Sequence, residues 1–185
     1  MSYVNGPSML RIVNVVASTR IKGLFDIEKL SQKLHHAQYD PEIFSGLVYR
    51  QASKPTIIMF SSGKISSQGA TSEEGAKQAI IDTVNQANTL GAIIGSSEVE
   101  KIQIENIVGT ASSNEEINLE SLAENLQNVI YEPEQFPGLI YRPSKNSPVC
   151  LIFSSGKLVI VGGKSTDQIS ETFRKVLRTI KNALA

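Results

Sequence analysis

The sequence predicts an α+β fold made of two copies of one unit, and three observations support this fold class. Two 13-residue segments, Gln38–Arg50 and Ile130–Arg142, are identical at eight positions. The block Phe-Ser-Ser-Gly-Lys occurs at 60–64 and again at 153–157. Each copy combines strand-like and helix-like hydrophobic periods. The repeat period is about 92 residues, so we expect a short extension at 1–9, a first repeat at 10–95 and a second at 96–185.

Each copy is expected to open with a strand, at 10–18 or 102–110, that leads into a short amphipathic helix. Asp26 and Asn118 are the expected N-caps, because their side chains can accept hydrogen bonds from the first free N–H groups of a helix. One face of each helix is apolar: Ile27, Leu30 and Leu34 in the first copy, and Leu119, Leu122 and Leu126 in the second.

Three further strands follow the short helix in each copy. They are expected at 46–50, 56–60 and 64–68 in the first copy, and at 138–142, 149–153 and 157–161 in the second. Gly63 and Gly156 indicate tight turns between the last two strands. Each copy closes with a long helix, and in the second copy Thr166 or Asp167 is its expected N-cap.

The alternation of side chains in these strands gives two apolar faces rather than one. In the strand at 56–60, Ile57 and Met59 share one face, and Ile58 and Phe60 share the other. The strand at 149–153 has the same pattern. One face is expected to pack on the helices, so the other is either covered by a partner sheet or open for a ligand.

Composition argues against a strongly basic protein. Lys plus Arg and Asp plus Glu are equal at 18 each, so the usual electrostatic signature of a nucleic-acid binder is missing and any basic patch must be local. The longest apolar runs are far shorter than the roughly 20 residues that cross a bilayer. We expect a soluble, intracellular protein with no membrane partner.

Catalytic and metal-binding patterns are not found in the sequence. Cys150 is the only cysteine, so neither an internal disulfide nor a cysteine zinc cluster is expected. His35 and His36 are adjacent and would point to different helix faces. No phosphate-binding loop or metal-ligand spacing occurs. The sequence therefore predicts no enzyme activity, no cofactor and no metal.

Three motifs together resemble the TATA-box-binding protein family, over essentially the whole chain from Leu10. They are Glu-Pro-Glu-Gln-Phe-Pro-Gly-Leu-Ile-Tyr-Arg at 132–142, the two Phe-Ser-Ser-Gly-Lys blocks, and Asn-Ile-Val-Gly at 106–109. The resemblance implies a saddle: two pseudo-symmetric repeats share one curved, continuous antiparallel sheet, with a concave DNA face and helices on the convex face. It also implies a general transcription factor that binds and bends TATA-box promoter DNA through the minor groove.

The resemblance assigns four phenylalanines as wedges that intercalate between base steps: Phe44, Phe60, Phe136 and Phe153. For any single phenylalanine a core position is the commoner alternative. The duplication, the shared strand face and the scarcity of other aromatic residues favour the wedge assignment. Wedges of this kind unstack a base step and let a bent duplex meet more protein surface.

Asn14 and Asn106 match the family's central asparagines, which donate to minor-groove acceptors. Adenine N3 and thymine O2 present the same acceptors in A·T and T·A pairs, so such contacts separate A·T from G·C. Further minor-groove contacts are implied for Val16, Val108, Ile58, Leu151, Val159, Gln68 and Val161. Phosphate contacts are implied for Arg50, Lys64, Arg142, Lys157 and Lys164; solvated surface charge is the alternative for each of them alone.

The sequence also departs from the family pattern. The usual Val-x-Thr-Gly is Ser66-Ser67-Gln68-Gly69 in the first copy and Val159-Ile160-Val161-Gly162 in the second, and a family lysine corresponds to Thr71. These changes affect the expected affinity and base preference, and more so in the first copy. A divergent paralogue that acts chiefly through proteins is one alternative, and a tandem sheet that stacks single-stranded nucleic acid is another.

Partners are implied by the same resemblance. Glu132 and Glu134 lie where the family meets transcription factor B, and a solvated turn is the alternative for either residue. RNA polymerase machinery and regulators on the convex helices are further expected partners. Only about nine residues precede the first strand, which favours an archaeal-type factor in the cytoplasm or nucleoid, whereas a eukaryotic member would be nuclear.

Overall fold

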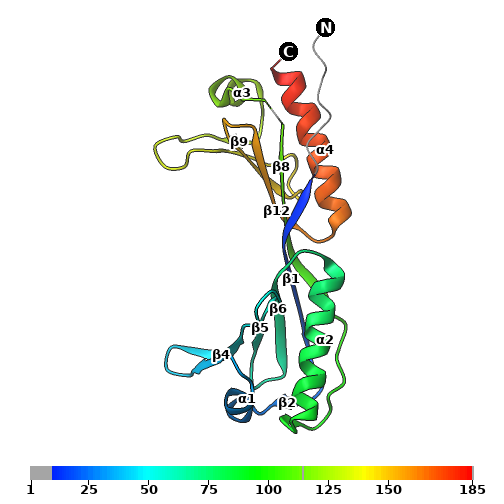
Figure 1. The fold of residues 1–185 in the computed structure, drawn as a ribbon. Coiled ribbons are helices and arrows are strands. Elements are labelled where there is room, and N and C mark those ends of the chain that lie inside the picture. The colour runs from blue at the N-terminus through cyan, green and yellow to red at the C-terminus, as the bar shows by residue number, and fades with distance from the viewer. Residues whose placement is uncertain (1–9, 114, 185) are drawn as a thin grey trace. The chain divides into compact units, whose positions relative to one another are not determined.

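The computed structural model describes residues 10–113 and 115–184, and the chain forms two compact units (Figure 1). The first unit contains residues 14–105, and the second contains residues 106–184 together with 10–13. The predicted extension at 1–9 lies outside the described residues.

The first unit is built on a five-stranded antiparallel sheet with two helices; the unit boundaries cut the strand at 11–20 after residue 13 and the strand at 103–112 after residue 105. Its elements are β1 (Arg11–Arg20), β2 (Leu24–Phe25), α1 (Ile27–Lys33), β3 (Ala37–Asp40), β4 (Phe44–Tyr49), β5 (Thr56–Met59), β6 (Lys64–Ala70), α2 (Glu73–Thr89) and β7 (Ile93–Ile94). The strand order is β3-β4-β5-β6-β1, and β2 pairs with β7 apart from this sheet. Helix α2 packs on β6 and β5, so it covers one face of the sheet (Figure 1).

The second unit repeats this arrangement. Its elements are β8 (Gln103–Ser112), α3 (Leu119–Asn125), β9 (Val129–Ile130), β10 (Leu139–Tyr141), β11 (Val149–Ile152), β12 (Lys157–Gly163) and α4 (Thr166–Ala183). The strand order is β9-β10-β11-β12-β8, with every pair antiparallel. Helix α4 packs on β12. The predicted α+β class, with antiparallel strands and a long helix closing each repeat, is confirmed.

The core of each unit lies between the sheet and its long helix. Ile57 and Met59 are buried on β5, and Cys150 and Ile152 are buried at the matching positions of β11. Each long helix contributes a buried stripe at helical spacing: Ala76, Ile80, Val84 and Ala87 on α2, and Ile169, Phe173, Val176 and Ile180 on α4. The predicted division of the strands into two faces is confirmed, because the alternate residues stay partly exposed.

The predicted caps are partly correct. Asp26 accepts from the backbone N–H of Lys29, and Asn118 accepts from that of Ser121, so both N-caps are confirmed. The predicted cap of the last helix is wrong. Ser165 is the N-cap and accepts from the backbone N–H of Gln168, which leaves Thr166 and Asp167 inside the first turn.

The remaining differences concern short strands and element ends. Strands β3 and β9, which were not predicted, pair with β4 and β10 at the outer edge of each sheet. Strand β4 begins at Phe44 rather than at residue 46, and α1 ends at Lys33, so that Leu34 is its C-cap. Among the described residues, no helix is long and apolar enough to cross a membrane.

Candidate nucleic-acid interface

In each unit, the sheet face opposite the long helix carries partly exposed side chains that lie next to one another across the strands. In the second unit, Leu151 pairs with Val159 and with Ile140, and Val159 pairs with Thr110. Val161 pairs with Val108 beside this row. The predicted contact residues of the second repeat therefore form one continuous, largely apolar surface.

The matching surface of the first unit is more polar. Ile58 pairs with Val48 on one side and with Ser66 on the other, and Ser66 pairs with Ser18. Gln68 pairs with Thr56 and is exposed, whereas Val16 is partly exposed on β1. Register therefore places the departures Ser66 and Gln68 on the uncovered face, while Thr71 is exposed beyond the end of β6.

The four predicted wedges form two edge-to-face pairs, one in each unit. The ring centroids of Phe44 and Phe60 are 5.7 Å apart with an interplanar angle of 73°. Those of Phe136 and Phe153 are 5.8 Å apart at 65°. None of the four rings is buried, and Phe44 is 42% exposed. Both pairs are thus open to solvent at the edge of the sheet rather than hidden beneath the helices.

A tight turn in each unit joins the backbone of one of these phenylalanines to that of a lysine four residues later. The backbone N–H of Phe60 donates to the carbonyl of Lys64, and Gly63, with φ of +85°, donates back to the carbonyl of Phe60. Phe153 and Lys157 are joined in the same way across Gly156. Only a residue that accepts a positive φ fits the last position of this turn, which explains both glycines.

In each unit, a glycine packs against the aromatic pair at a position where a Cβ atom would crowd the rings. A Cβ atom added at Gly46 would lie 2.6 Å from Cε1 of Phe44 and 2.9 Å from Cε1 of Phe60. At Gly138 the corresponding distances to Phe136 and Phe153 are 2.8 and 3.1 Å. Sequence reasoning missed this role, although the identical glycine in the repeated 13-residue block was its signal.

The two predicted base-reading asparagines make the same contact in both units. Oδ1 of Asn14 accepts from the backbone N–H of Gly69 at 2.8 Å, and Oδ1 of Asn106 accepts from that of Gly162 at 3.0 Å. Both asparagines are partly exposed and share strand parity with the partly exposed Val16 and Val108, whereas the intervening Val15 and Ile107 are buried. They therefore lie on the uncovered face of their strands.

The predicted phosphate contacts are all exposed side chains. In the first unit, Nη1 of Arg50 donates to Oε1 of Gln38 on β3 at 2.6 Å. Lys64 pairs in register with Arg20, so two cations are neighbours at this end of the sheet. In the second unit, Nη1 of Arg142 lies 3.5 Å from the carbonyl of Ser147. Lys157 pairs in register with Ser112, and Lys164 follows the end of β12.

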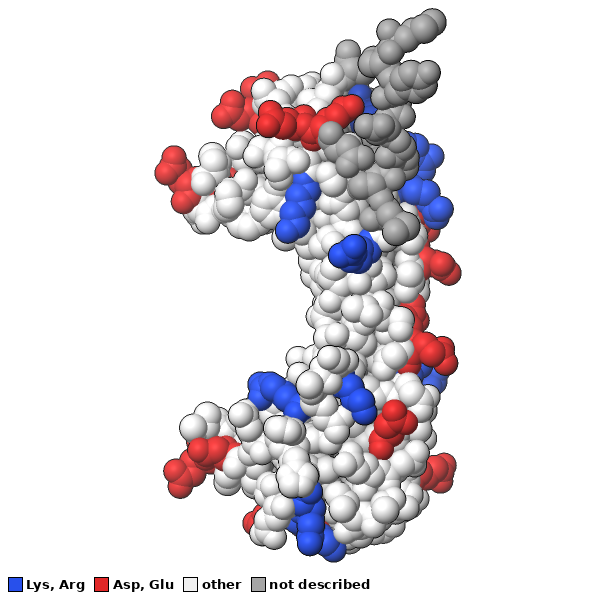
Figure 2. Space-filling view, in the orientation of Figure 1, with Lys and Arg blue, Asp and Glu red and all other residues white. Residues whose placement is uncertain are grey.

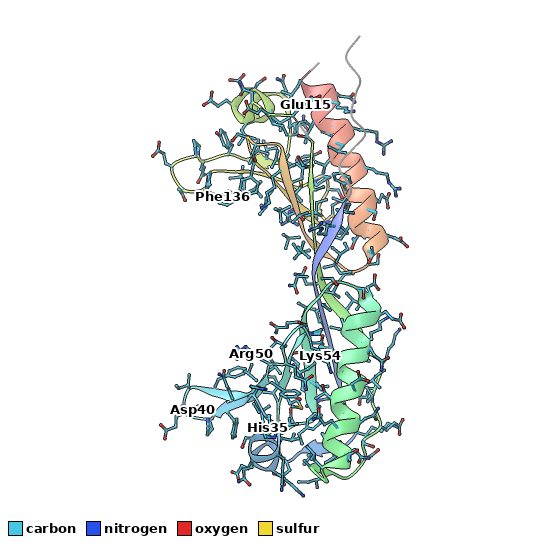
Figure 3. The ribbon with its side chains drawn as sticks, viewed as in Figure 1. His35, Asp40, Arg50, Lys54, Glu115 and Phe136 are labelled. Atoms are coloured by element: carbon cyan, nitrogen blue, oxygen red, sulfur yellow. The ribbon has the colours of Figure 1, made fainter. Side chains whose placement is uncertain are left out.

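Acidic side chains occupy the loop between the first two strands at the outer edge of each sheet. Glu132 and Glu134 are exposed between β9 and β10, and in the first unit Asp40, the last residue of β3, and Glu42, in the loop that follows, are exposed. Figure 2 shows red atoms at the projecting end of this loop in both units. Figure 3 shows Asp40 near the tip of the first loop and Phe136 on the chain that returns from the second. Only Glu132 and Glu134 were predicted from the sequence to meet a partner.

The described residues contain no metal-binding cluster, and the cysteine among them is buried. They contain no cluster of three or more His, Cys, Asp or Glu side chains that could hold a metal ion. Cys150 is buried against the helix side of the sheet, and this burial raises the pKa of its thiol to about 12. Such a thiol stays protonated and unreactive at neutral pH.

Comparisons with known proteins agree over nearly the full length. The family described as "Transcription factor TFIID (or TATA-binding protein, TBP)" matches residues 9–86 and 101–183. The TATA-box-binding protein of Methanothrix thermoacetophila is 42% identical over 181 residues, which cover 95% of this chain and 97% of the relative. That of Methanocaldococcus jannaschii is 42% identical over 173 residues, which cover 93% of each chain.

A solved structure gives the same result. The structure titled "Methanococcus jannaschii TBP" aligns with a TM-score of 0.83 and 42% identity, covering 94% of this chain and 98% of that one. With the repeated sheet, the paired rings and the family match in agreement, the chain belongs to the family of transcription factor TFIID, or TATA-binding protein.

Proposed function

We propose that this chain is a general transcription factor that binds TATA-box promoter DNA in the minor groove and bends it. The observation that carries this proposal is the uncovered sheet face of each unit, which presents a pair of exposed phenylalanines at one edge. Insertion of apolar wedges into minor-groove base steps is known for TATA-binding proteins themselves, for which it is the type case. The edge-to-face pairs supply two bulky apolar groups at each insertion point.

The preference for A·T pairs follows because the apolar part of the same face has no hydrogen-bond acceptor for the amino group of guanine. Val159, Leu151 and Val161 present methyl groups, and these cannot accept a hydrogen bond from the guanine N2 amino group in the minor groove. A buried donor without a partner costs about 1–3 kcal/mol, so G·C pairs are disfavoured by exclusion. Asn14 and Asn106 are the donors to the acceptors that A·T pairs present.

Exposed cations at both ends of these strands supply the contacts with phosphates. Lys64 and Lys157 close the turns that begin at Phe60 and Phe153, whereas Arg50 and Arg142 follow the ends of β4 and β10 that lie away from the rings. Lys164 is a further candidate beyond β12. Each neutralised phosphate releases counterions, so affinity falls with salt by about 0.9 in log-log slope per contact. Local cations of this kind are compatible with a net charge of zero.

Protein partners of this factor are proposed at two places. Glu132 and Glu134, exposed at the tip of the second loop, would engage basic groups of transcription factor B. RNA polymerase would follow on the assembled promoter complex, and regulators would use the exposed faces of α2 and α4. The role is DNA-associated and non-catalytic.

One observation favours a second candidate, a paralogue that keeps the fold but acts mainly through proteins. Ser18, Ser66 and Gln68 make the uncovered face of the first unit more polar than that of the second. A weakened first half would reduce discrimination between promoter sequences. Equal binding of a TATA duplex and a G·C-rich duplex at the same salt concentration would favour this candidate.

The proposed function is tested by bending measured on the full chain. A TATA duplex labelled at both ends should show increased fluorescence transfer when the protein binds, and Phe136→Ala combined with Phe153→Ala should abolish the increase. Ile94→Ala, at a 60% exposed position on β7, is the control and should bend DNA as the wild type does. Unaltered bending by the double variant would remove the wedge assignment.

A further inference from the structure

The two asparagine contacts lie at a β-bulge that occurs at the same place in both units. Between β1 and β6, the register shifts between Val15 and Ala17, where β6 has an additional residue. Between β12 and β8 it shifts between Val161 and Gly163, so that Gly162 is the additional residue. The glycines at these bulges, Gly69 and Gly162, have φ of +90° and +97°. A glycine with positive φ is typical of such a bulge.

The bulge determines which end of the asparagine amide faces outward. A backbone N–H can only donate, so only the oxygen end of the amide can face Gly69 or Gly162. The Nδ2 amino group is therefore directed away from the bulge glycine. Within the described part of the chain, Nδ2 of Asn14 and Nδ2 of Asn106 make no other hydrogen bond. Each asparagine thus turns its donors outward, while its oxygen faces the bulge glycine.

The glycines are required for their backbone conformation and not for space. A Cβ added at Gly69 would meet nothing within 4 Å, and at Gly162 the nearest atom is Cα of Pro148 at 4.0 Å. The residues just before them, Gln68 and Val161, differ between the two units, whereas the glycine and its contact with asparagine recur. The recurring feature is therefore the N–H that the positive φ directs at the amide.

We propose that Gly69 and Gly162 are positioning residues that fix the amides of Asn14 and Asn106 with the amino group outward, and so set the preference for A·T over G·C at the base steps these asparagines face. This inference rests on the proposed function. The fixed donor suits adenine N3 and thymine O2, and it opposes the amino group that guanine places in the minor groove. An amide free to turn could present its oxygen to that amino group and would lose the distinction.

Two substitutions at one glycine separate conformation from side-chain bulk. Asparagine tolerates a positive φ far better than a β-branched residue does. Gly162→Asn should therefore keep the bulge, and Gly162→Val should lose it, although both add a side chain of similar size at an open position. The measurement is the ratio of affinities for a TATA duplex and for the same duplex with its central A·T pairs changed to G·C. We expect Gly162→Asn to keep the wild-type ratio and Gly162→Val to lower it about tenfold, the order of one base-pair mismatch.

A third variant covers the case in which Gly162→Val does not fold. Asn106→Asp keeps an oxygen for the N–H of Gly162 and replaces the outward amino group by a second oxygen. It should unfold at the wild-type urea concentration, whereas its affinity ratio should shift toward G·C; charge repulsion by itself would weaken both duplexes alike. In the free protein, side-chain amide relaxation by NMR should show Asn106 to be ordered in the wild type and mobile in Gly162→Val.

The outcomes distinguish this inference from the proposed function. If the wild type itself does not prefer the TATA duplex, the proposed function fails. If the wild type prefers it and either a folded Gly162→Val or Asn106→Asp keeps the full preference, the positioning role of the glycine is overturned.

Discussion

The contact between Gly138 and the second aromatic pair permits a quantitative test through Gly138→Ala. The new Cβ would lie 2.8 Å from Cε1 of Phe136, 3.1 Å from Cε1 of Phe153 and 3.2 Å from the carbonyl oxygen of Ile152. Carbon atoms in favourable contact are about 3.5–4.0 Å apart, so the edge of the Phe136 ring must retreat by roughly 0.7 Å or more. The carbonyl belongs to the backbone of β11 and has little freedom to move.

The free energies follow from these contacts. Gly138 does not have a positive φ, so alanine causes no backbone strain and the effect comes from crowding. Overpacking costs about 1–3 kcal/mol, and the lower end applies because partly exposed rings can turn outward. On the proposed function, rings displaced in this way insert less deeply between the base pairs. A loss of about 1–2 kcal/mol from incomplete insertion lowers affinity for the TATA duplex roughly 5- to 30-fold.

Urea unfolding and end-to-end fluorescence transfer are the two assays. Gly138→Ala should be destabilised by about 1 kcal/mol and should bend the duplex less. Adding Phe136→Leu removes the atom in closest contact, so the double variant should regain stability while bending stays impaired. A folded Gly138→Ala protein with wild-type affinity and bending would refute the argument that the rings must keep this position.

Three further predictions follow from single residues. Lys157→Gln should weaken binding to TATA and G·C duplexes equally, and it should reduce the slope of log affinity against log salt by about 0.9. Titrations at several salt concentrations measure both effects. A change in selectivity between the two duplexes would contradict a phosphate contact. Ser67 is fully buried and its Oγ has no partner among the described residues, so Ser67→Ala should raise the free energy of unfolding by about 1 kcal/mol in urea titrations, and a loss of stability would be the opposite result. Burial raises the pKa of Cys150 from 9.0 to about 12, so the unfolded chain releases this proton at lower pH than the folded chain does. The free energy of unfolding should therefore be highest below pH 9 and fall as pH rises toward 12. Cys150→Ala should lessen this decline in urea titrations. An unchanged decline in the variant would count against the buried thiol as its cause.

The features predicted from the sequence are those that depend on local signals. The caps Asp26 and Asn118 were predicted because a short polar side chain before an apolar helical stripe is a local pattern. The same rule chose Thr166 or Asp167 over Ser165, since all three residues are common caps and only the contact with Gln168 decides among them. The two apolar faces of β5 and β11 were visible in the alternation of side chains alone.

The features that were missed depend on pairing between distant segments. Strand β3 is short and mostly polar, so it becomes a strand only by pairing with β4, and the contact of Arg50 with Gln38 depends on that pairing. The bulge at Gly69 is defined by the register of β6 against β1, which the sequence does not contain. Likewise, the glycine behind each aromatic pair was visible as a repeated residue, whereas its contact with the rings required the turn geometry.

The central claim is that this protein reads the minor groove of A·T-rich DNA, and base substitution tests it most directly. Inosine·cytosine pairs lack the minor-groove amino group and so resemble A·T there, while their major groove resembles that of G·C. A TATA duplex rebuilt with inosine·cytosine pairs should bind within about threefold of the original, and the corresponding G·C duplex should bind far more weakly. If the inosine·cytosine duplex bound as weakly as the G·C duplex, minor-groove recognition would be contradicted.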